Sequence, residues 1–307
     1  MKKKPNRIEL RVPASTSNLG PGYDAIGLSV SLYNEFLFER IESGLEIRIE
    51  GEGADVLPRS TEHRGYQAFQ KACQNLGHEV PGLRIVQHNA IPLARGLGGS
   101  GTAVLAGTLA AFLFAGVEPN PSGVLDQSFT IETHPDNITP SLVGGLTISA
   151  IDGAHVAYIK LVTPTDLTTV VLIPERGLNT DEARKVVPKQ FSREDMVFNI
   201  RGAGMIMAAL ATNQLDHLPL AMRDRLHQPY RALLLPGMME IFQAALDAGS
   251  PGVALSGAGS GIFAFAYHHN EKAIGDAMKA AAARFDMKAH NLFLPVDREG
   301  LRTVRVS

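Results

Sequence analysis

The 307-residue chain contains no tryptophan and only one cysteine, Cys73. A single cysteine excludes an intramolecular disulfide and a metal centre built from several thiolates. This cysteine usage suits a reducing cytoplasm, and we expect Cys73 to be a buried helical residue. The chain also lacks a run of about 20 apolar residues, which a membrane-spanning helix needs. No apolar segment follows the basic residues 1–7, so we interpret them as a solvated tail rather than a signal peptide.

An excess of charge of either sign is also absent. The chain has 29 basic and 31 acidic side chains, for a formal net charge of −2. This balance gives no electrostatic basis for binding nucleic acid or an anionic membrane. The length is more than one compact core needs, so we predict two domains. The composition therefore favours an ordinary globular protein of a reducing cytoplasm.

The apolar pattern predicts alternating helices and strands in the first half of the chain. We expect strands over residues 8–13, 26–40, 45–51 and 83–89, and helices over 61–76, 100–115 and 121–132. Two strand-like runs within 144–161 flank Asp152-Gly153, which is typical of a hairpin. We place the domain boundary directly after this hairpin, which divides the chain into residues 1–162 and 163–307.

The second half also mixes helices and strands. A strand is expected over 168–174, two short strands within 252–267 around a glycine turn, and a last strand over 292–295. Helical spacing covers 179–186, 193–211, 237–248 and 271–285. Asn270 stands where it can cap the last of these helices.

A glycine-rich segment opens the apolar helix predicted over 100–115. Gly96, Gly98, Gly99 and Gly101 surround Ser100 in the sequence ARGLGGSG. Glycines let backbone N–H groups approach an anion, and a helix start adds its free N–H groups and positive dipole end. The Ser100 hydroxyl could be a ligand of a magnesium ion on bound phosphates. The segment lacks the lysine of a P-loop, and the alternative is a packing turn without a ligand.

Polar residues gather in two further stretches. In VPASTSNLGPGYDAIGLSV (12–30), a polar run and a Gly-Pro-Gly turn precede Asp24, whose carboxylate needs a partner or solvent beside an apolar strand. The alternative is an ordinary Asx-turn. In IETHPDNITPSLVGG (131–145), the density of polar groups is typical of a site lining, although a satisfied loop network has the same pattern. The spacing in this second stretch is not that of a zinc motif, and no cysteine accompanies it.

The last candidates lie in the second half. Gly257, Gly259 and Gly261 separate two strand-like runs in LSGAGSGIFAF, which indicates close approach of another backbone or a ligand, or else a tight hairpin. Arg184 and Arg231 lie in two helical segments. Arginine can bind a carboxylate through two hydrogen bonds, although each arginine alone is more typical of a surface charge.

Together these stretches resemble the homoserine kinases of the GHMP superfamily. The similarity covers nearly the whole chain in the same order, through VPASTSNLGPGYDAIGL, PLARGLGGSGTA, HPDNITPSLVGG and LSGAGSG. It implies a two-domain α+β fold, with a ribosomal-S5-domain-2-like N-terminal domain, a ferredoxin-like C-terminal domain and an active site between them. The implied reaction converts ATP and L-homoserine to ADP and O-phospho-L-homoserine in threonine biosynthesis. Magnesium as cofactor and a homodimer are implied as well.

On the nucleotide side, the resemblance assigns roles to the glycine segment and the third motif. Ser100 matches a magnesium ligand, and its partner is a carboxylate before the HPDN stretch, either Glu132, which we prefer, or Asp126. The predicted ATP-binding residues are Pro92, Leu93, Ala94, Arg95, Gly96, Leu97, Gly98, Gly99, Ser100, Gly101, Thr102, Gly257 and Gly259.

On the amino-acid side, the resemblance implies that Arg184 and Arg231 bind the carboxylate of homoserine. Asp24 would take its ammonium or hydroxyl group. The full set predicted to hold homoserine is Asn18, Asp24, His134, Asp136, Arg184 and Arg231.

The expected mechanism depends on positioning and charge neutralisation, because phosphoryl transfer through a loose transition state needs no strong base. Asn137 matches the position where mevalonate-type relatives have an aspartate base, and an amide cannot accept the proton as a carboxylate does. We therefore predict direct attack of the homoserine hydroxyl on the γ-phosphate, with Asn18, Asp24 and Asn137 as the residues at the reacting atoms.

The chain departs from the family pattern mainly on the nucleotide side. Gly99 and Gly101-Thr102 replace Ser and Ala-Ala, His63 replaces an asparagine near the adenine, and Ser260-Gly261 replaces Pro-Thr or Pro-Ser. We expect a more flexible ATP segment and altered adenine recognition. Two alternatives stay open: a GHMP kinase with another small hydroxylated substrate or nucleotide, and a non-catalytic GHMP paralogue that binds ligands.

Overall fold

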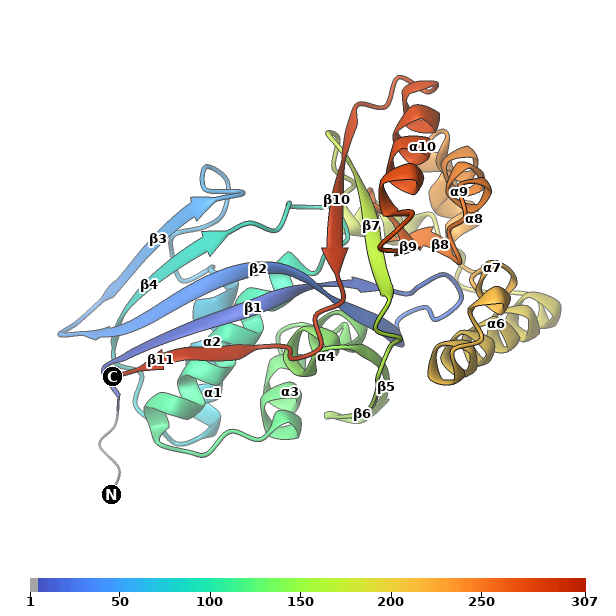
Figure 1. The fold of residues 1–307 in the computed structure, drawn as a ribbon. Helices are drawn as coiled ribbons and strands as arrows, with labels where there is room; N and C mark the ends of the chain where they lie inside the picture. Colours follow the sequence, from blue (N-terminus) through green and yellow to red (C-terminus); the bar gives the residue numbers. More distant parts are fainter. Residues whose placement is uncertain (1–4) are drawn as a thin grey trace.

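The computed structural model describes residues 5–307, so residues 1–4 of the predicted solvated tail lie outside it. The first part of the fold is a seven-stranded sheet covered on one side by helices (Figure 1). Its strands are β1 (Arg7–Ser17), β2 (Ile26–Ile41), β3 (Leu45–Gly51), β4 (Gly82–Asn89), β5 (Leu146–Asp152), β6 (His155–Leu161) and β11 (Arg302–Val306). The helices are α1 (Arg64–Asn75), α2 (Gly99–Ala115), α3 (Pro121–Phe129) and α4 (Pro135–Val143).

The strand order is β11-β1-β2-β4-β3. Strand β2 is the longest strand of this sheet and pairs with β1, β4 and β5. All pairs are antiparallel except β3 with β4, and β5 pairs with the start of β2 and with β6. The 12–30 stretch lies at the end of the sheet where the start of β2 pairs with both β1 and β5.

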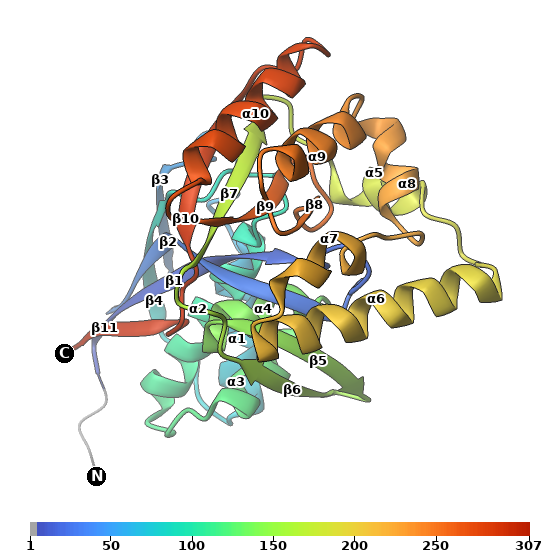
Figure 2. The same cartoon turned by 45° about the vertical axis from the view of Figure 1, so that its right-hand side comes forward.

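The second part is a four-stranded antiparallel sheet of order β10-β7-β9-β8. It contains β7 (Leu167–Pro174), β8 (Val253–Leu255), β9 (Ile262–Tyr267) and β10 (Ala289–Pro295), and α9 (Met238–Asp247) and α10 (Glu271–Ala283) pack on one face. The remaining helices are α5 (Thr180–Lys185), α6 (Arg193–Thr212), α7 (Leu218–Ala221) and α8 (Gln228–Arg231), with 3₁₀ turns at Leu215–His217 and Ala232–Leu234. Figure 2 shows α6 running along the side of the molecule beside α7 and β5.

Helix α2 lies at the centre of the first core. Almost every residue from Gly101 to Phe114 is buried, which is the pattern of a helix surrounded by protein on all sides. Phe114 of α2 meets Phe69 of α1 edge to face with ring centroids 5.8 Å apart, and Phe69 stacks on Phe38 of β2 at 6.1 Å. Each buried phenyl group contributes about 2 kcal/mol. This packing fixes the position of the helix start, which carries the glycine segment.

Several sequence predictions are confirmed by these elements. Strand β3 has the predicted bounds, and the hairpin around Asp152-Gly153 forms as β5 and β6. Cys73 is buried in α1, and burial raises the pKa of its thiol to about 11, so it is an unreactive core residue. The expected second set of strands and helices is present as well. Among residues 5–307, no helix has both the length and the apolar character that crossing a membrane requires.

Several details of the predicted elements are wrong. Strand β1 extends to Ser17 rather than ending at residue 13, and α1 begins at Arg64 rather than at residue 61. Helix α3 ends at Phe129 rather than at residue 132, which leaves 130–134 as a turn. Asn270 stands at the start of α10 but does not cap it, because its side-chain oxygen accepts from the N–H of Tyr267 at 2.8 Å instead. Strand β10 is not the last strand, since β11 follows it and pairs with β1. The proposed division at residues 162–163 therefore leaves β11 in the sheet of the first segment.

The HPDN stretch forms a helix, α4, that the sequence pattern did not indicate. Pro140 lies inside this helix and cannot donate to the carbonyl of Asp136. That carbonyl instead lies directly against Gly27, where a Cβ atom would overlap it. A close approach of β2 thus accommodates the proline, and it turns the start of α4 toward the junction of the two sheets.

Candidate active site

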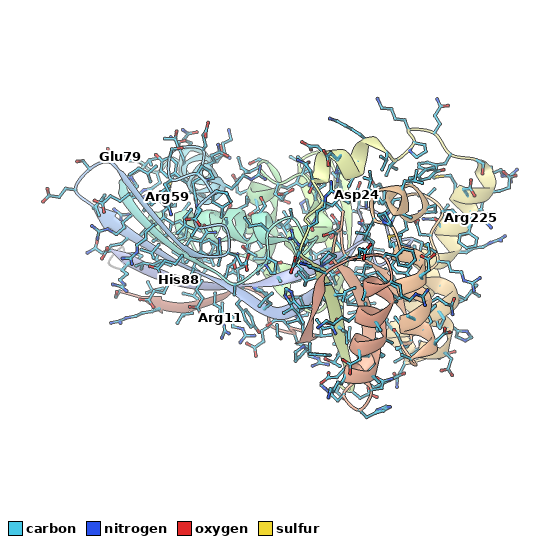
Figure 3. All side chains as sticks on the ribbon, turned by 90° about the horizontal axis from the view of Figure 1, so that it is seen from above. Arg11, Asp24, Arg59, Glu79, His88 and Arg225 are labelled. Carbon is cyan, nitrogen blue, oxygen red and sulfur yellow. The ribbon has the colours of Figure 1, made fainter. Side chains whose placement is uncertain are left out.

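One cavity of about 450 Å³ lies where the four sequence stretches meet, a volume that suits small-molecule ligands. Figure 3 shows Asp24, one of its residues, near the junction of the two halves of the molecule. The predicted residues that line the cavity are Asn18, Asp24, the segment from Pro92 to Gly101, Glu132, His134, Asp136, Asn137, Arg184 and Arg231. Folding therefore gathers nearly all of the predicted site in one place.

The glycine segment connects β4 to α2 in a conformation that needs glycine. Gly96 and Gly98 have φ angles of 70° and 68°, and a Cβ atom on Gly96 would overlap the carbonyl oxygen of Ser256. Helix α2 begins at Gly99, and Ser100 is exposed at the second position of its first turn. The unpaired N–H groups of this helix start make it suited to binding an anion.

Three of the predicted nucleotide contacts, Thr102, Gly257 and Gly259, lie outside the cavity lining. Thr102 is buried, and its hydroxyl donates to the carbonyl of Gly99 at 2.7 Å and accepts from the Asn34 side chain at 3.0 Å. Of the third motif, Ala258 lines the cavity whereas Gly257 and Gly259 do not. The Ser256 hydroxyl donates to the carbonyl of Gly96 at 2.8 Å, so this motif supports the glycine segment from behind.

Arg95 also has a supporting role in this structure. Its guanidinium donates to the backbone carbonyls of Leu93, Pro174 and Glu175. Two of these carbonyls lie at the end of β7. Arg95 therefore ties the glycine segment to the second sheet, although it also lines the cavity.

His63 lines the cavity together with Gln87 and Asn89. Its Nδ1 accepts from the N–H of Tyr66 and its Nε2 donates to Gln87 at 2.7 Å, while Gln87 in turn donates to Asn89 at 2.6 Å. Burial lowers the pKa of His63, so the ring is neutral at pH 7. Altered adenine recognition stays a prediction, and the residues of the cavity that surround His63 are Gln87 and Asn89.

Glu132 is the carboxylate that faces the cavity, on the turn between α3 and α4. Its two oxygens accept from His134 Nδ1 at 2.6 Å and Arg64 Nη2 at 2.9 Å. Burial acts to raise the pKa of Glu132, but His134 and Arg64 hold it below its ordinary value. The hydrogen bond that His134 donates to Glu132 raises the pKa of His134 in turn. Asp126 accepts from His155 and Val156 on β6 instead and does not line the cavity.

The oxygen ligands beside Glu132 suit a magnesium ion that would also bind the phosphates of a nucleotide. A serine hydroxyl and a carboxylate are the hard oxygen ligands that magnesium prefers, and Ser100 and Glu132 line the same cavity. In the described part of the chain, no group of three or more His, Cys, Asp and Glu side chains is arranged to hold a metal by itself. Phosphate and water oxygens would have to complete the coordination.

Two further carboxylates, Asp24 and Asp136, line the same cavity. Asn18 has a φ of 71° and accepts from the N–H of Asp24 at 2.9 Å, which orients the Asp24 turn. The Asp24 carboxylate pairs with Arg184 at 3.3 Å. Asp136 is 1% exposed, and burial together with the charge of Asp24 raises its pKa to about 6. A cationic group bound here would relieve the repulsion between the two carboxylates.

Arg231 is held by a buried histidine that the sequence reasoning did not assign. Arg231 is 2% exposed and donates to the carbonyls of Ala183 and Gly257, both at 3.1 Å, and to His227 Nδ1 at 3.0 Å. His227 Nε2 donates to the carbonyl of Gly20 at 2.7 Å, and burial lowers the pKa of His227 to about 4. The i, i+4 spacing of the two residues was the only signal available.

The two-sheet fold and its candidate site agree with the class of protein that the family comparisons identify, the GHMP kinases. Residues 64–145 match the family described as GHMP kinases N terminal domain, and residues 206–284 match GHMP kinases C terminal. The chain is 42% identical over 279 residues to homoserine kinase of Moorella thermoacetica, covering 91% of this chain and 94% of that protein. It is 36% identical over 296 residues to homoserine kinase of Aquifex aeolicus, covering 96% and 99%.

A solved structure agrees with these relatives. The crystal structure of homoserine kinase from Cytophaga hutchinsonii superposes with a TM-score of 0.90 at 26% identity, and the match covers 99% of each chain. The chain therefore belongs to the GHMP kinases, and within them to the homoserine kinase family. The predicted fold class and resemblance are confirmed.

Proposed function

We propose that this protein transfers the γ-phosphoryl group of ATP to the side-chain hydroxyl of L-homoserine, giving ADP and O-phospho-L-homoserine for threonine biosynthesis. The observation that carries the proposal is the single cavity that joins the start of α2 to the Asp24, Asp136, Arg184 and Arg231 set. One end offers N–H groups to phosphates, and the other offers carboxylates and arginines to an ammonium and a carboxylate. The 35–42% identical homoserine kinases support the same reaction. We further propose a cytoplasmic homodimer.

In the proposed mechanism, the protein positions the two substrates and neutralises charge. The amides of the glycine segment and the start of α2 hold the phosphates in place, and the acidic and arginine residues orient homoserine with its hydroxyl toward them. Ser100 and Glu132 would hold Mg²⁺, which supplies positive charge to the phosphates when bound. Loss of the hydroxyl proton accompanies transfer and needs no dedicated strong base.

A coupled assay tests the proposal directly. Purified protein should release ADP only when L-homoserine is present with ATP, and L-serine, mevalonate and shikimate should support little release. Replacing ATP with GTP in the same assay measures the preference for the phosphoryl donor. Absence of homoserine-dependent ADP release from folded protein would overturn the proposal, and release with one of the other acceptors would identify a different kinase of this class.

Asn137 should contribute little to the chemical step. Its backbone carbonyl accepts from the Ser15 hydroxyl at 2.8 Å, and its side-chain amide lies 3.4 Å from Asp136 Oδ1. Because an amide is not a base, we expect Asn137→Ala to lower kcat by less than about tenfold, whereas losing a general base costs about 10²-fold or more. Steady-state kinetics decide this. A fall in kcat of that larger size, with KM and folding unchanged, would make Asn137 essential to the reaction.

Homoserine binding should weaken in mildly acidic solution. The ammonium group is held by Asp136 only when this carboxyl is ionised, and its pKa is raised to about 6. We therefore expect kcat/KM for homoserine to fall about tenfold per pH unit below about pH 6. His134 stays protonated in this window because Glu132 raises its pKa.

The pH profile has an internal control. Asp24 adds to the raised pKa of Asp136, so Asp24→Asn should move the acidic limb of kcat/KM to lower pH, whatever its effect on the plateau. A profile that is flat down to about pH 5, or a limb that Asp24→Asn leaves in place, would show that Asp136 does not hold the ammonium.

A further inference from the structure

Arg64 is a cavity residue to which neither the sequence motifs nor the reaction assigns a role. It is the first residue of α1, directly after His63, and it lines the cavity with its side chain 41% exposed. Its Nη2 donates to the backbone carbonyl of Ile131 at 3.0 Å and to the carboxylate of Glu132 at 2.9 Å. Arg64 therefore stands beside the carboxylate proposed to hold magnesium.

Arg64 has N–H groups that donate no hydrogen bond to the protein. Both hydrogen bonds to the protein come from Nη2, and the Nε–H is buried without a hydrogen-bond partner. A guanidinium has donors on all three nitrogens, and a buried donor without a partner is unfavourable. Nη1 also donates to no protein group, and unlike Nε it is not a buried atom, so it is available to a ligand in the cavity.

The other arginines of the cavity are held by groups other than Glu132, and Arg184 resembles Arg64 in having an Nε–H without a partner. The lining contains arginines at positions 64, 95, 184 and 231 and no lysine. Arg95 donates to backbone carbonyls of the second sheet, and Arg184 pairs with Asp24. Arg231 is buried at the amino-acid end among Ala183, His227 and Gly257. Arg64 is the arginine beside the proposed magnesium carboxylate, which makes it the candidate for binding the anionic chain of the nucleotide.

We propose that Arg64 binds the phosphate chain of the nucleotide through Nη1 while its Nη2 keeps the Glu132 carboxylate oriented. A planar guanidinium matches phosphate oxygens. The glycine segment lacks the lysine of a P-loop, and the positive charge of Arg64 takes its place. This inference rests on the proposed function, since it places the nucleotide in the same cavity. The competing explanation is that Arg64 only supports Glu132 and affects ATP through bound magnesium.

Nucleotide titrations separate the two explanations. We would measure the affinities of adenosine, ADP and ATP by calorimetry for the wild type, Arg64→Lys and Arg64→Met, first in EDTA and then with magnesium. Lysine keeps a charge near Glu132 but lacks the planar guanidinium. We expect Arg64→Lys and Arg64→Met to weaken ATP by about tenfold or more in EDTA and to leave adenosine within about twofold. Arg48→Lys is the matched control, because Arg48 is an exposed partner of Glu50 on β3.

Each other outcome contradicts the proposal. An equal loss for adenosine and ATP would show that the substitution disturbs the cavity rather than a phosphate contact. A loss that occurs with magnesium and disappears in EDTA would show that Arg64 acts only through Glu132. A failure of the proposed function is recognised separately, because wild-type protein would then bind ATP without homoserine-dependent ADP release.

Discussion

Replacing Glu132 with glutamine is expected to lower kcat/KM for ATP by about 100-fold or more. The substitution keeps the shape of the side chain but removes the charge that is proposed to hold magnesium. It also leaves the cations Arg64 and His134, which donate to the two oxygens of Glu132, without their shared anion. Steady-state kinetics over a range of magnesium concentrations measure the loss, and we expect a higher magnesium requirement together with a lower kcat.

Asp126→Asn is the matched control for this prediction. Asp126 binds His155 and the backbone of Val156 on β6, outside the cavity, so its substitution should leave kcat/KM within about threefold of the wild type. A large loss in Asp126→Asn together with near-normal activity in Glu132→Gln would show that Asp126 is the magnesium carboxylate. The assignment of Glu132 would then be wrong.

Replacing Arg231 with methionine is expected to raise KM for homoserine by about 100-fold, because truncating one partner of a desolvated charge pair costs about 2–5 kcal/mol. The protein should also lose stability. Arg231 is buried, and methionine leaves the carbonyl of Ala183 and the Nδ1 of His227 without their donor, whereas the carbonyl of Gly257 keeps the hydrogen bond from Asn18. Each buried acceptor left unpaired costs about 1–3 kcal/mol. Thermal unfolding with and without homoserine, beside the kinetics, measures both effects.

Arg225→Lys serves as the control for Arg231→Met. Arg225 is half exposed, pairs with Asp195, and lies on the outer side of the C-terminal half (Figure 3), and such surface pairs contribute little. We expect near-normal KM values and stability. If Arg231→Met raised KM for ATP instead and left KM for homoserine unchanged, Arg231 would not be the residue that binds the carboxylate of the amino acid.

The elements that local pattern determines could be predicted from the sequence. Residues 45–51 alternate and form β3 with the predicted bounds, and the all-apolar run after Ser100 forms the buried helix α2. The four motifs were identified by residue type, and the cavity brings nearly all of their polar residues together. Glycine, asparagine and aspartate at turns can be recognised from local sequence. Cationic residues near carboxylates in the sequence can be recognised in the same way.

Features that depend on contacts distant in sequence could not be predicted in this way. Helix α4 contains Pro140, which argues against a helix until Gly27 of β2 is seen to accommodate the freed carbonyl. The segment 302–306 becomes a strand because β1 offers it an edge. The burial of Thr102, the support of Arg231 by His227 and the pairing of Arg64 with Glu132 all arise from packing between separate elements.

The identification of the phosphorylated product tests most directly whether the two ends of the cavity act together. Phosphorus NMR of a mixture of protein, magnesium, ATP and L-homoserine should show the γ-phosphate resonance of ATP declining as ADP and a phosphate monoester appear in equal amounts. The monoester should show coupling to the side-chain methylene protons of homoserine. Formation of ADP and inorganic phosphate without a monoester, or no consumption of ATP at all, would contradict the proposed transfer.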